Sequence, residues 1–192
     1  MEKRNWKRSV TLKQRMVLCL AAFFAAFALQ LALNGYQARA VQQVQDDQMG
    51  NFNAISRFQG GVESSISILE AYRWENGETE EMLEKLRATY STSNAWLWRI
   101  RSNMDGLQNV SDEQWVLYGA VETTYGSYNT LLEELEDYLS SGQDAKASQL
   151  YYNKVSVCGG YLSQYTMQLL KASILDAQTT YTEISELGER IA

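Results

Sequence analysis

Proline is absent from this sequence of 192 residues. An interior proline costs a helix about 3 kcal/mol, so a chain without proline permits long, uninterrupted helices. The strict alternation of apolar and polar residues that marks a strand is also almost missing. The sequence therefore predicts an all-α protein.

Histidine is absent as well, and cysteine occurs only at Cys19 and Cys158. The usual ligand sets for transition metals are therefore missing, so we expect no metal site and no cofactor. No nucleophile, base or cofactor motif is present, and we predict no catalytic residue in this chain. Because Cys19 lies in an apolar run far from Cys158, we expect no disulfide between them.

Positive charge is scarce beyond the first residues. Six of the 17 basic side chains and only one of the 23 acidic ones lie in residues 1–15, which leaves a charge of −11 on the rest of the chain. Binding to nucleic acid depends on neutralising phosphates with Lys and Arg. An acidic domain of this kind excludes nucleic acid as a partner.

Residues 16–33 carry no charge, and Gln30 is their only strongly polar side chain. As a helix this run spans roughly 27 Å, close to the thickness of a bilayer's hydrocarbon core. The basic residues before it favour a cytoplasmic N-terminus. We therefore predict a cytoplasmic leader (1–15), a transmembrane helix (16–34) and an extracytoplasmic domain (35–192) in the cell membrane.

A cleaved signal peptide is the alternative, since Ala38-Arg39-Ala40 offers small residues at a cleavage spacing. The apolar run is longer than the usual 7–15 residues of such signals, which favours an uncleaved anchor.

Apolar residues spaced by three and four predict helices over about 35–74, 80–107, 112–139 and 144–192. Two are long and two short, as in an antiparallel up-down four-helix bundle. The pattern of the fourth helix continues to Ala192 without a stop, so we expect the chain to be truncated before a second transmembrane helix. The predicted buried stripe of the first helix consists of Val41, Val44, Gln48, Phe52, Ile55, Gln59, Val62, Ile66 and Leu69. That of the second consists of Leu83, Leu86, Tyr90, Ser93, Leu97, Ile100, Met104 and Leu107.

The leader Ser9-Val10-Thr11-Leu12-Lys13-Gln14-Arg15, one span and a four-helix domain together form a familiar layout. It resembles the N-terminal sensory part of bacterial transmembrane receptors, namely sensor histidine kinases of two-component systems and methyl-accepting chemotaxis proteins. The resemblance implies a homodimer that senses a small molecule or an envelope protein and transmits the signal across the membrane. If the parent is a kinase, its catalytic domains are not in this chain.

We expect a sensor histidine kinase as the parent, with a chemotaxis receptor as the alternative. A membrane-anchored structural or adaptor bundle without signalling output is the third interpretation.

Counting inward from the outer tip of the predicted bundle brings several glycines and two tryptophans to one level. Glycine inside a helix costs about 0.5–1 kcal/mol relative to alanine, so these glycines require a compensating close approach of helices or a cavity. The level comprises Gly60, Gly61, Trp96, Trp98, Thr124, Tyr125, Gly126, Cys158, Gly159 and Gly160.

In the simpler interpretation, Trp96 or Trp98 fills the space that the glycines leave. In the functional interpretation, the level holds a small-molecule pocket where Arg57, Arg99 or Arg101 pairs with an anionic ligand and an indole stacks on it.

Arg73 and Trp74, near the predicted outer tip, form a second candidate for ligand recognition, because arginine and exposed aromatics are common on recognition surfaces. A cap over the end of the bundle is the alternative role for this pair.

Overall fold

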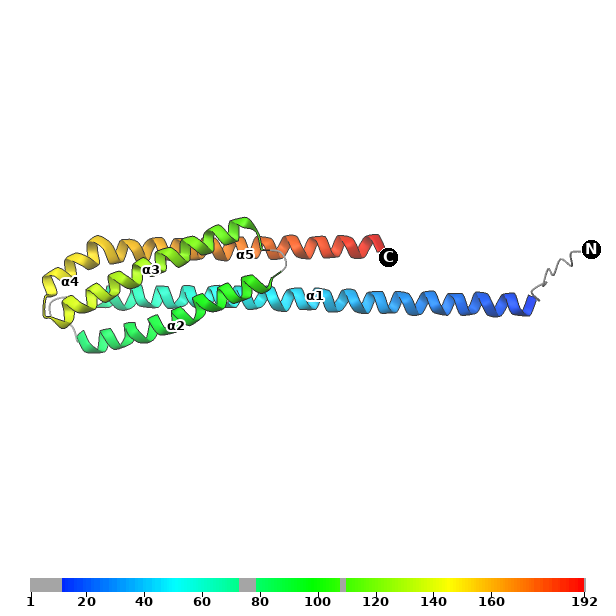
Figure 1. The fold of residues 1–192 in the computed structure, drawn as a ribbon, viewed down its shortest axis with the longest axis horizontal. Coiled ribbons are helices and arrows are strands. Elements are labelled where there is room, and N and C mark those ends of the chain that lie inside the picture. The colour runs from blue at the N-terminus through cyan, green and yellow to red at the C-terminus, as the bar shows by residue number, and fades with distance from the viewer. Residues whose placement is uncertain (1–11, 73–78, 108–109, 192) are drawn as a thin grey trace, which may run out of the picture. The chain divides into compact units, whose positions relative to one another are not determined.

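The computed structural model describes residues 12–72, 79–107 and 110–191, and every regular element in these ranges is helical. The predicted all-α fold class is confirmed. In chain order the elements are α1 (Leu12–Ala71), α2 (Thr79–Gly106), α3 (Asp112–Ser140), α4 (Asp144–Leu150), the π-helical turn η1 (Tyr151–Val155) and α5 (Ser156–Ile191) (Figure 1).

Local sequence signals set the ends of the middle helices, and the predicted bounds of α2 and α3 lie within one residue of those observed. Ser111 is the N-cap of α3, and its side chain accepts a hydrogen bond from the backbone N–H of Gln114 at 3.2 Å. After α3, Gly142 has a φ of 69°, a left-handed conformation that favours glycine.

The prediction of an unbroken fourth helix is wrong at one turn. The five residues of η1 separate α4 from α5, and Tyr151 and Val155 at its two ends are both buried. A π turn is wider than an α turn, so it changes which side chains of the following helix face the core. Apolar spacing alone does not reveal such a turn, because both flanking segments keep the same helical period.

The chain divides into two compact units, residues 1–43 and residues 44–192, and α1 contributes to both. In the first unit, the described side chains between residues 16 and 36 are all exposed. Among the described residues, α1 is the one helix long and apolar enough to cross a membrane, with a window of mean hydropathy 1.6. The prediction of an apolar, span-length helix near the N-terminus is thus confirmed.

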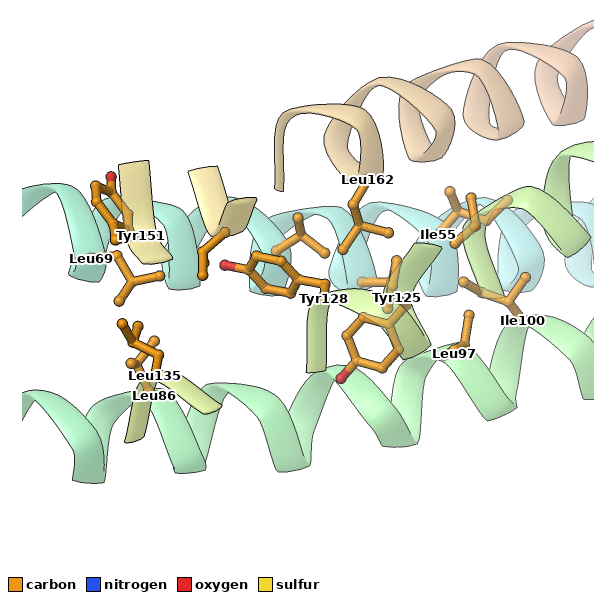
Figure 2. Close-up of a cluster of buried hydrophobic side chains, with 14 of the residues drawn as sticks. Ile55, Leu69, Leu86, Leu97, Ile100, Tyr125, Tyr128, Leu135, Tyr151 and Leu162 are labelled. Carbon is orange, nitrogen blue, oxygen red and sulfur yellow. The ribbon is translucent and has the colours of Figure 1, made fainter. Parts of the chain in front are cut away.

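The second unit contains a hydrophobic core to which every described helix contributes. Figure 2 shows Ile55 and Leu69 of α1 near side chains of α2 and α3, together with Tyr151 of η1 and Leu162 of α5. The largest fully buried side chains are Tyr128, Phe58, Ile55, Leu69, Ile100, Met104, Leu135, Leu162 and Leu169.

The predicted stripe of α2 is confirmed, because its members are buried or partly buried against the core. The stripe predicted for the first helix is correct only in part, because Ile55, Val62 and Leu69 are buried as expected. Phe52 is 37% exposed, whereas Phe58, which the stripe omits, is fully buried. The true stripe passes through the polar Asn51 and Ser65. The sequence does not reveal this stripe, because Asn51 and Ser65 are polar. Both are buried because each forms a hydrogen bond with a residue of another helix.

Candidate sensory site

The predicted glycine level contains two close approaches between helices. A Cβ at Gly61 of α1 would overlap the hydroxyl of Ser93 on α2. A Cβ at Gly159 of α5 would lie 3.2 Å from both Ile66 Cγ1 and Tyr128 Cε2. At these two positions the missing side chain lets a neighbouring helix come nearer than alanine would allow.

The other three glycines of this level do not act in this way. A Cβ added at Gly60, Gly126 or Gly160 would meet nothing within 4 Å. All three are exposed, because they lie on the outward faces of α1, α3 and α5. The prediction that all five glycines support close approach is therefore wrong for these three.

Neither tryptophan fills the space between the helices as the simpler interpretation expects. Trp98 is 68% exposed, and Trp96 is half-buried at the edge of the core. Trp96 and Trp98 are not fully buried because Leu97, which lies between them in the sequence, occupies the buried position of α2.

Three other aromatic side chains occupy this part of the core. The rings of Phe58 (α1) and Tyr125 (α3) meet edge to face at 5.1 Å between centroids. Tyr90 of α2 stacks on Tyr125 at 6.1 Å, and the Tyr125 hydroxyl donates a hydrogen bond to the Tyr90 carbonyl oxygen at 3.2 Å. This aromatic cluster ties α1, α2 and α3 together, and the predicted stripe of the first helix omits its member Phe58.

The candidate arginines are not brought together in the core. Arg57 and Arg99 are exposed, and the exposed Arg101 lies 3.5 Å from Glu122 in an ion pair between α2 and α3. Arg73 and Trp74 lie outside the described residues. The described arginines of the predicted pocket thus lie on the outer surface, where any anion they pair with stays in contact with solvent.

Buried phenols are the chemically distinctive groups of the core. Burial raises the pKa of Tyr128 to about 12, and it also raises the pKa of Tyr125. The Tyr128 hydroxyl forms a hydrogen bond with the Ser65 hydroxyl of α1, with 3.1 Å between the two oxygens. These hydroxyls stay protonated at neutral pH, so they serve as hydrogen-bond partners between helices rather than as acids or bases.

Cys158 is half-buried, and its thiol lies 3.7 Å from the Thr124 carbonyl oxygen of α3. Burial raises the pKa of this thiol, so it is mostly protonated at neutral pH. In the described part of the chain, no three His, Cys, Asp or Glu side chains gather as a metal-binding group.

Several polar residues are hydrogen-bonded between helices at the end of the core where α3 begins. Asn51 of α1 donates from Nδ2 to Ser173 Oγ of α5 at 3.2 Å, and the Ser111 N–H donates to Asp176 Oδ2 at 3.1 Å. Gln114 is buried one turn after Ser111. The sequence does not reveal the first contact, because an Asn in a helical pattern carries no signal of burial.

Comparison with known proteins identifies no relative of this chain: no protein-family model, no curated protein and no solved structure matches it.

Proposed function

We propose that this chain is the signal-sensing and transmembrane signal-transducing module of a bacterial sensor histidine kinase, anchored in the cell membrane. The observation that carries the proposal is the composition of α1. This one helix contains an apolar, fully exposed stretch of span length and the first strip of a packed helical core. A helix shared by a span and a core can carry a change of packing to the membrane.

The core supports the proposal that residues 44–192 form an antiparallel up-down four-helix bundle. The helices α3 and α5 are antiparallel, because Thr124 contacts Cys158 whereas the earlier residue Ser111 contacts the later residue Asp176. Helix α1 also packs against the other helices, since Gly61 contacts Ser93 of α2 and Ser65 is bonded to Tyr128 of α3. Sensory bundles transmit by small shifts of such packed helices.

The proposed module is a homodimer. Exposed apolar side chains lie on the exterior of α1 and α5 near the contact of Asn51 with Ser173; they are Met49, Phe52, Met167 and Ile174. Met167 and Ile174 are seven residues apart, the spacing of a helix-pairing stripe.

The dimer is tested by light scattering of the detergent-solubilised chain. Phe52→Glu with Ile174→Glu is expected to produce monomers, since charges would have to be buried at the interface. Val116→Glu is the matched control, because Val116 is 73% exposed on α3. A double variant that stays dimeric would place the interface elsewhere.

The topology is tested by cysteine labelling in intact cells, after Cys19 and Cys158 are replaced by serine. A membrane-impermeant maleimide is expected to label Val116→Cys directly and Ser9→Cys only after the membrane is permeabilised. Labelling in the reverse order, or of both positions in intact cells, contradicts a cytoplasmic leader with an extracytoplasmic domain.

The output is tested by the DNA that follows the codon of Ala192. A second apolar run and a histidine-containing phosphoacceptor domain support the sensor kinase. Long methylation helices instead support the chemotaxis receptor, and an immediate stop codon supports a membrane-anchored structural or adaptor bundle.

A further inference from the structure

On α1, α3 and α5, the buried positions of the second unit change from apolar to polar at one end of the core. On α1 the fully buried Asn51 precedes the first buried apolar residue, Ala54. On α3 Gln114, 1% exposed, precedes Tyr118, and on α5 Ser173, 2% exposed, follows Ala172. We call Asn51, Gln114 and Ser173, together with Gln48 one turn before Asn51, the polar layer.

Two hydrogen bonds between helices place these residues at nearly one level. Asn51 is bonded to Ser173, which joins α1 to α5. The Ser111 N–H is bonded to Asp176, which joins α3 to α5. Because α3 and α5 run in opposite directions, the residue one turn after Ser111 lies opposite the residue one turn before Asp176. Those residues are Gln114 and Ser173.

The layer is buried without being fully paired. The oxygens Gln48 Oε1, Asn51 Oδ1 and Gln114 Oε1 are inaccessible to solvent and have no hydrogen-bond partner among the described residues. A fourth oxygen of this kind belongs to Asn129, farther along α3. An unpaired buried acceptor destabilises the arrangement that buries it. Three of the four such oxygens thus belong to one end of the core.

The middle of the same core has the opposite character. The Ser65 hydroxyl donates to the Val62 carbonyl oxygen and is bonded to Tyr128, and the Thr166 hydroxyl donates to the Leu162 carbonyl oxygen. Gly159 fits closely against Ile66 and Tyr128. Tight apolar packing of this kind resists displacement, because a shifted helix would create both voids and overlaps.

Amide side chains tolerate displacement better than such packing does. Each Asn or Gln carries two donor hydrogens and one acceptor oxygen, so an amide layer can form hydrogen bonds in several arrangements. A shift of α5 that carries the Ser173 hydroxyl toward Gln48 Oε1 or Gln114 Oε1 would pair an oxygen that is unpaired in the observed arrangement. The layer therefore supports two packings of similar free energy, as a conformational switch requires.

We propose that the polar layer is a repacking joint, at which α5 can shift against α1 and α3 while the middle of the core keeps its packing. The joint is a property of the packing itself; its use in signalling rests on the receptor function proposed above.

The joint is tested by amide hydrogen exchange of the full chain in lipid nanodiscs, without any stimulus. Both regions to be compared lie inside the continuous helical segment formed by α4, η1 and α5, so fraying of a helix end does not explain a difference between them. We expect residues 170–177 to exchange at least ten-fold faster than residues 159–166. Equal protection of these two regions overturns the proposal.

The cause is tested by the double variant Asn51→Leu with Gln114→Leu, which replaces the amides by apolar side chains of similar size. Exchange at residues 170–177 is expected to slow at least ten-fold, while residues 159–166 are unchanged. The matched control Ser65→Ala removes a paired polar group from the middle of the core, so it should not slow exchange at 170–177. Unchanged or faster exchange at 170–177 in the double variant overturns the proposal.

If the double variant does not fold, the single variant Gln114→Met replaces it. Exchange at residues 170–177 is then expected to slow by about three-fold. The labelling test of topology is independent of these measurements. Failure of the joint leaves the topology unchanged, and failure of the topology leaves the exchange pattern unchanged.

Discussion

The middle of the core and the residues Asn51, Gln114 and Ser173 of the polar layer are all buried, but they are held in different ways. In the middle, Phe58 and Tyr125 meet edge to face and Gly159 accommodates Tyr128 and Ile66. In the polar layer, one hydrogen bond joins Asn51 to Ser173, while three amide oxygens remain unpaired. The comparison teaches that burial by itself does not fix a packing, because only complementary shapes or completed hydrogen bonds do so.

The largest effect is expected where an aromatic ring is removed from the middle. Phe58→Ala should lower the free energy of unfolding by about 3–5 kcal/mol, because it leaves a cavity beside Tyr125. Val116→Ala, at a position 73% exposed on α3 and outside the proposed dimer interface, should cost less than about 1 kcal/mol. Thermal unfolding of the detergent-solubilised chain, followed by near-UV circular dichroism, measures both. Similar losses for the two variants would show that the middle is not specially packed.

A side chain added at the close approach of Gly159 to Ile66 and Tyr128 should act next most strongly. Gly159→Leu is expected to cost about 2–3 kcal/mol, since it must displace Ile66 and the Tyr128 ring. Gly160→Leu adds the same side chain on the outward face and should stabilise the helix by about 0.5 kcal/mol. The same unfolding measurement applies. A Gly159 variant as stable as the Gly160 variant contradicts the close approach of α5.

Alkaline pH should weaken the middle through Tyr128. Its pKa in the folded chain, about 12, lies above the ordinary value near 10. The stabilising contribution is therefore complete below pH 10 and is lost as the pH rises toward 12. In urea unfolding between pH 8 and pH 11.5, Tyr128 should account for about 2 kcal/mol of the loss in stability.

Tyr128→Phe should reduce that alkaline loss, while Tyr118→Phe should reduce it less. The pKa of Tyr118 is also raised to about 12, first by burial, but its hydroxyl donates to Glu122 at the edge of α3. Equal slopes in the two variants would mean that the middle and the edge are equally closed to solvent.

The smallest effect is expected for single hydroxyls. Ser173→Ala removes the hydrogen bond that joins α5 to Asn51 and should cost about 1 kcal/mol. Thr166→Val loses only a bond to the Leu162 carbonyl oxygen of its own helix, so a change below about 0.5 kcal/mol is expected. Thermal unfolding distinguishes them. If Ser173→Ala has no effect, the single bond between α1 and α5 in the polar layer does not contribute to stability.

Helix existence and most boundaries were predictable because their signals are local. Ser111 caps α3 through its own side chain, and the three-and-four spacing of α2 selects one face without ambiguity. The first helix was less predictable, since its apolar residues suit two overlapping stripes. Phe58 and Phe52 are equally apolar, and only contacts with α3 decide that Phe58 is inside.

The candidate site was predictable only in part. Two of the five glycines, Gly61 and Gly159, lie at close approaches, but Trp98 points outward and the candidate arginines lie on the surface. An error of one residue in helical register turns a side chain by about 100°, which is enough to move it from the core to solvent. The polar layer was missed because sequence patterns treat amide side chains as exposed.

The sequence by itself determined the helical class, the long apolar helix and the turns, because proline content, charge and capping act within a few residues of where they occur. The tertiary structure decided which faces meet and which polar groups are buried. It placed Asn51 against Ser173 and Gly159 against Tyr128, pairs separated by at least 31 positions in the chain. Contacts of that range depend on the relative rotation of whole helices, and no local pattern specifies that rotation.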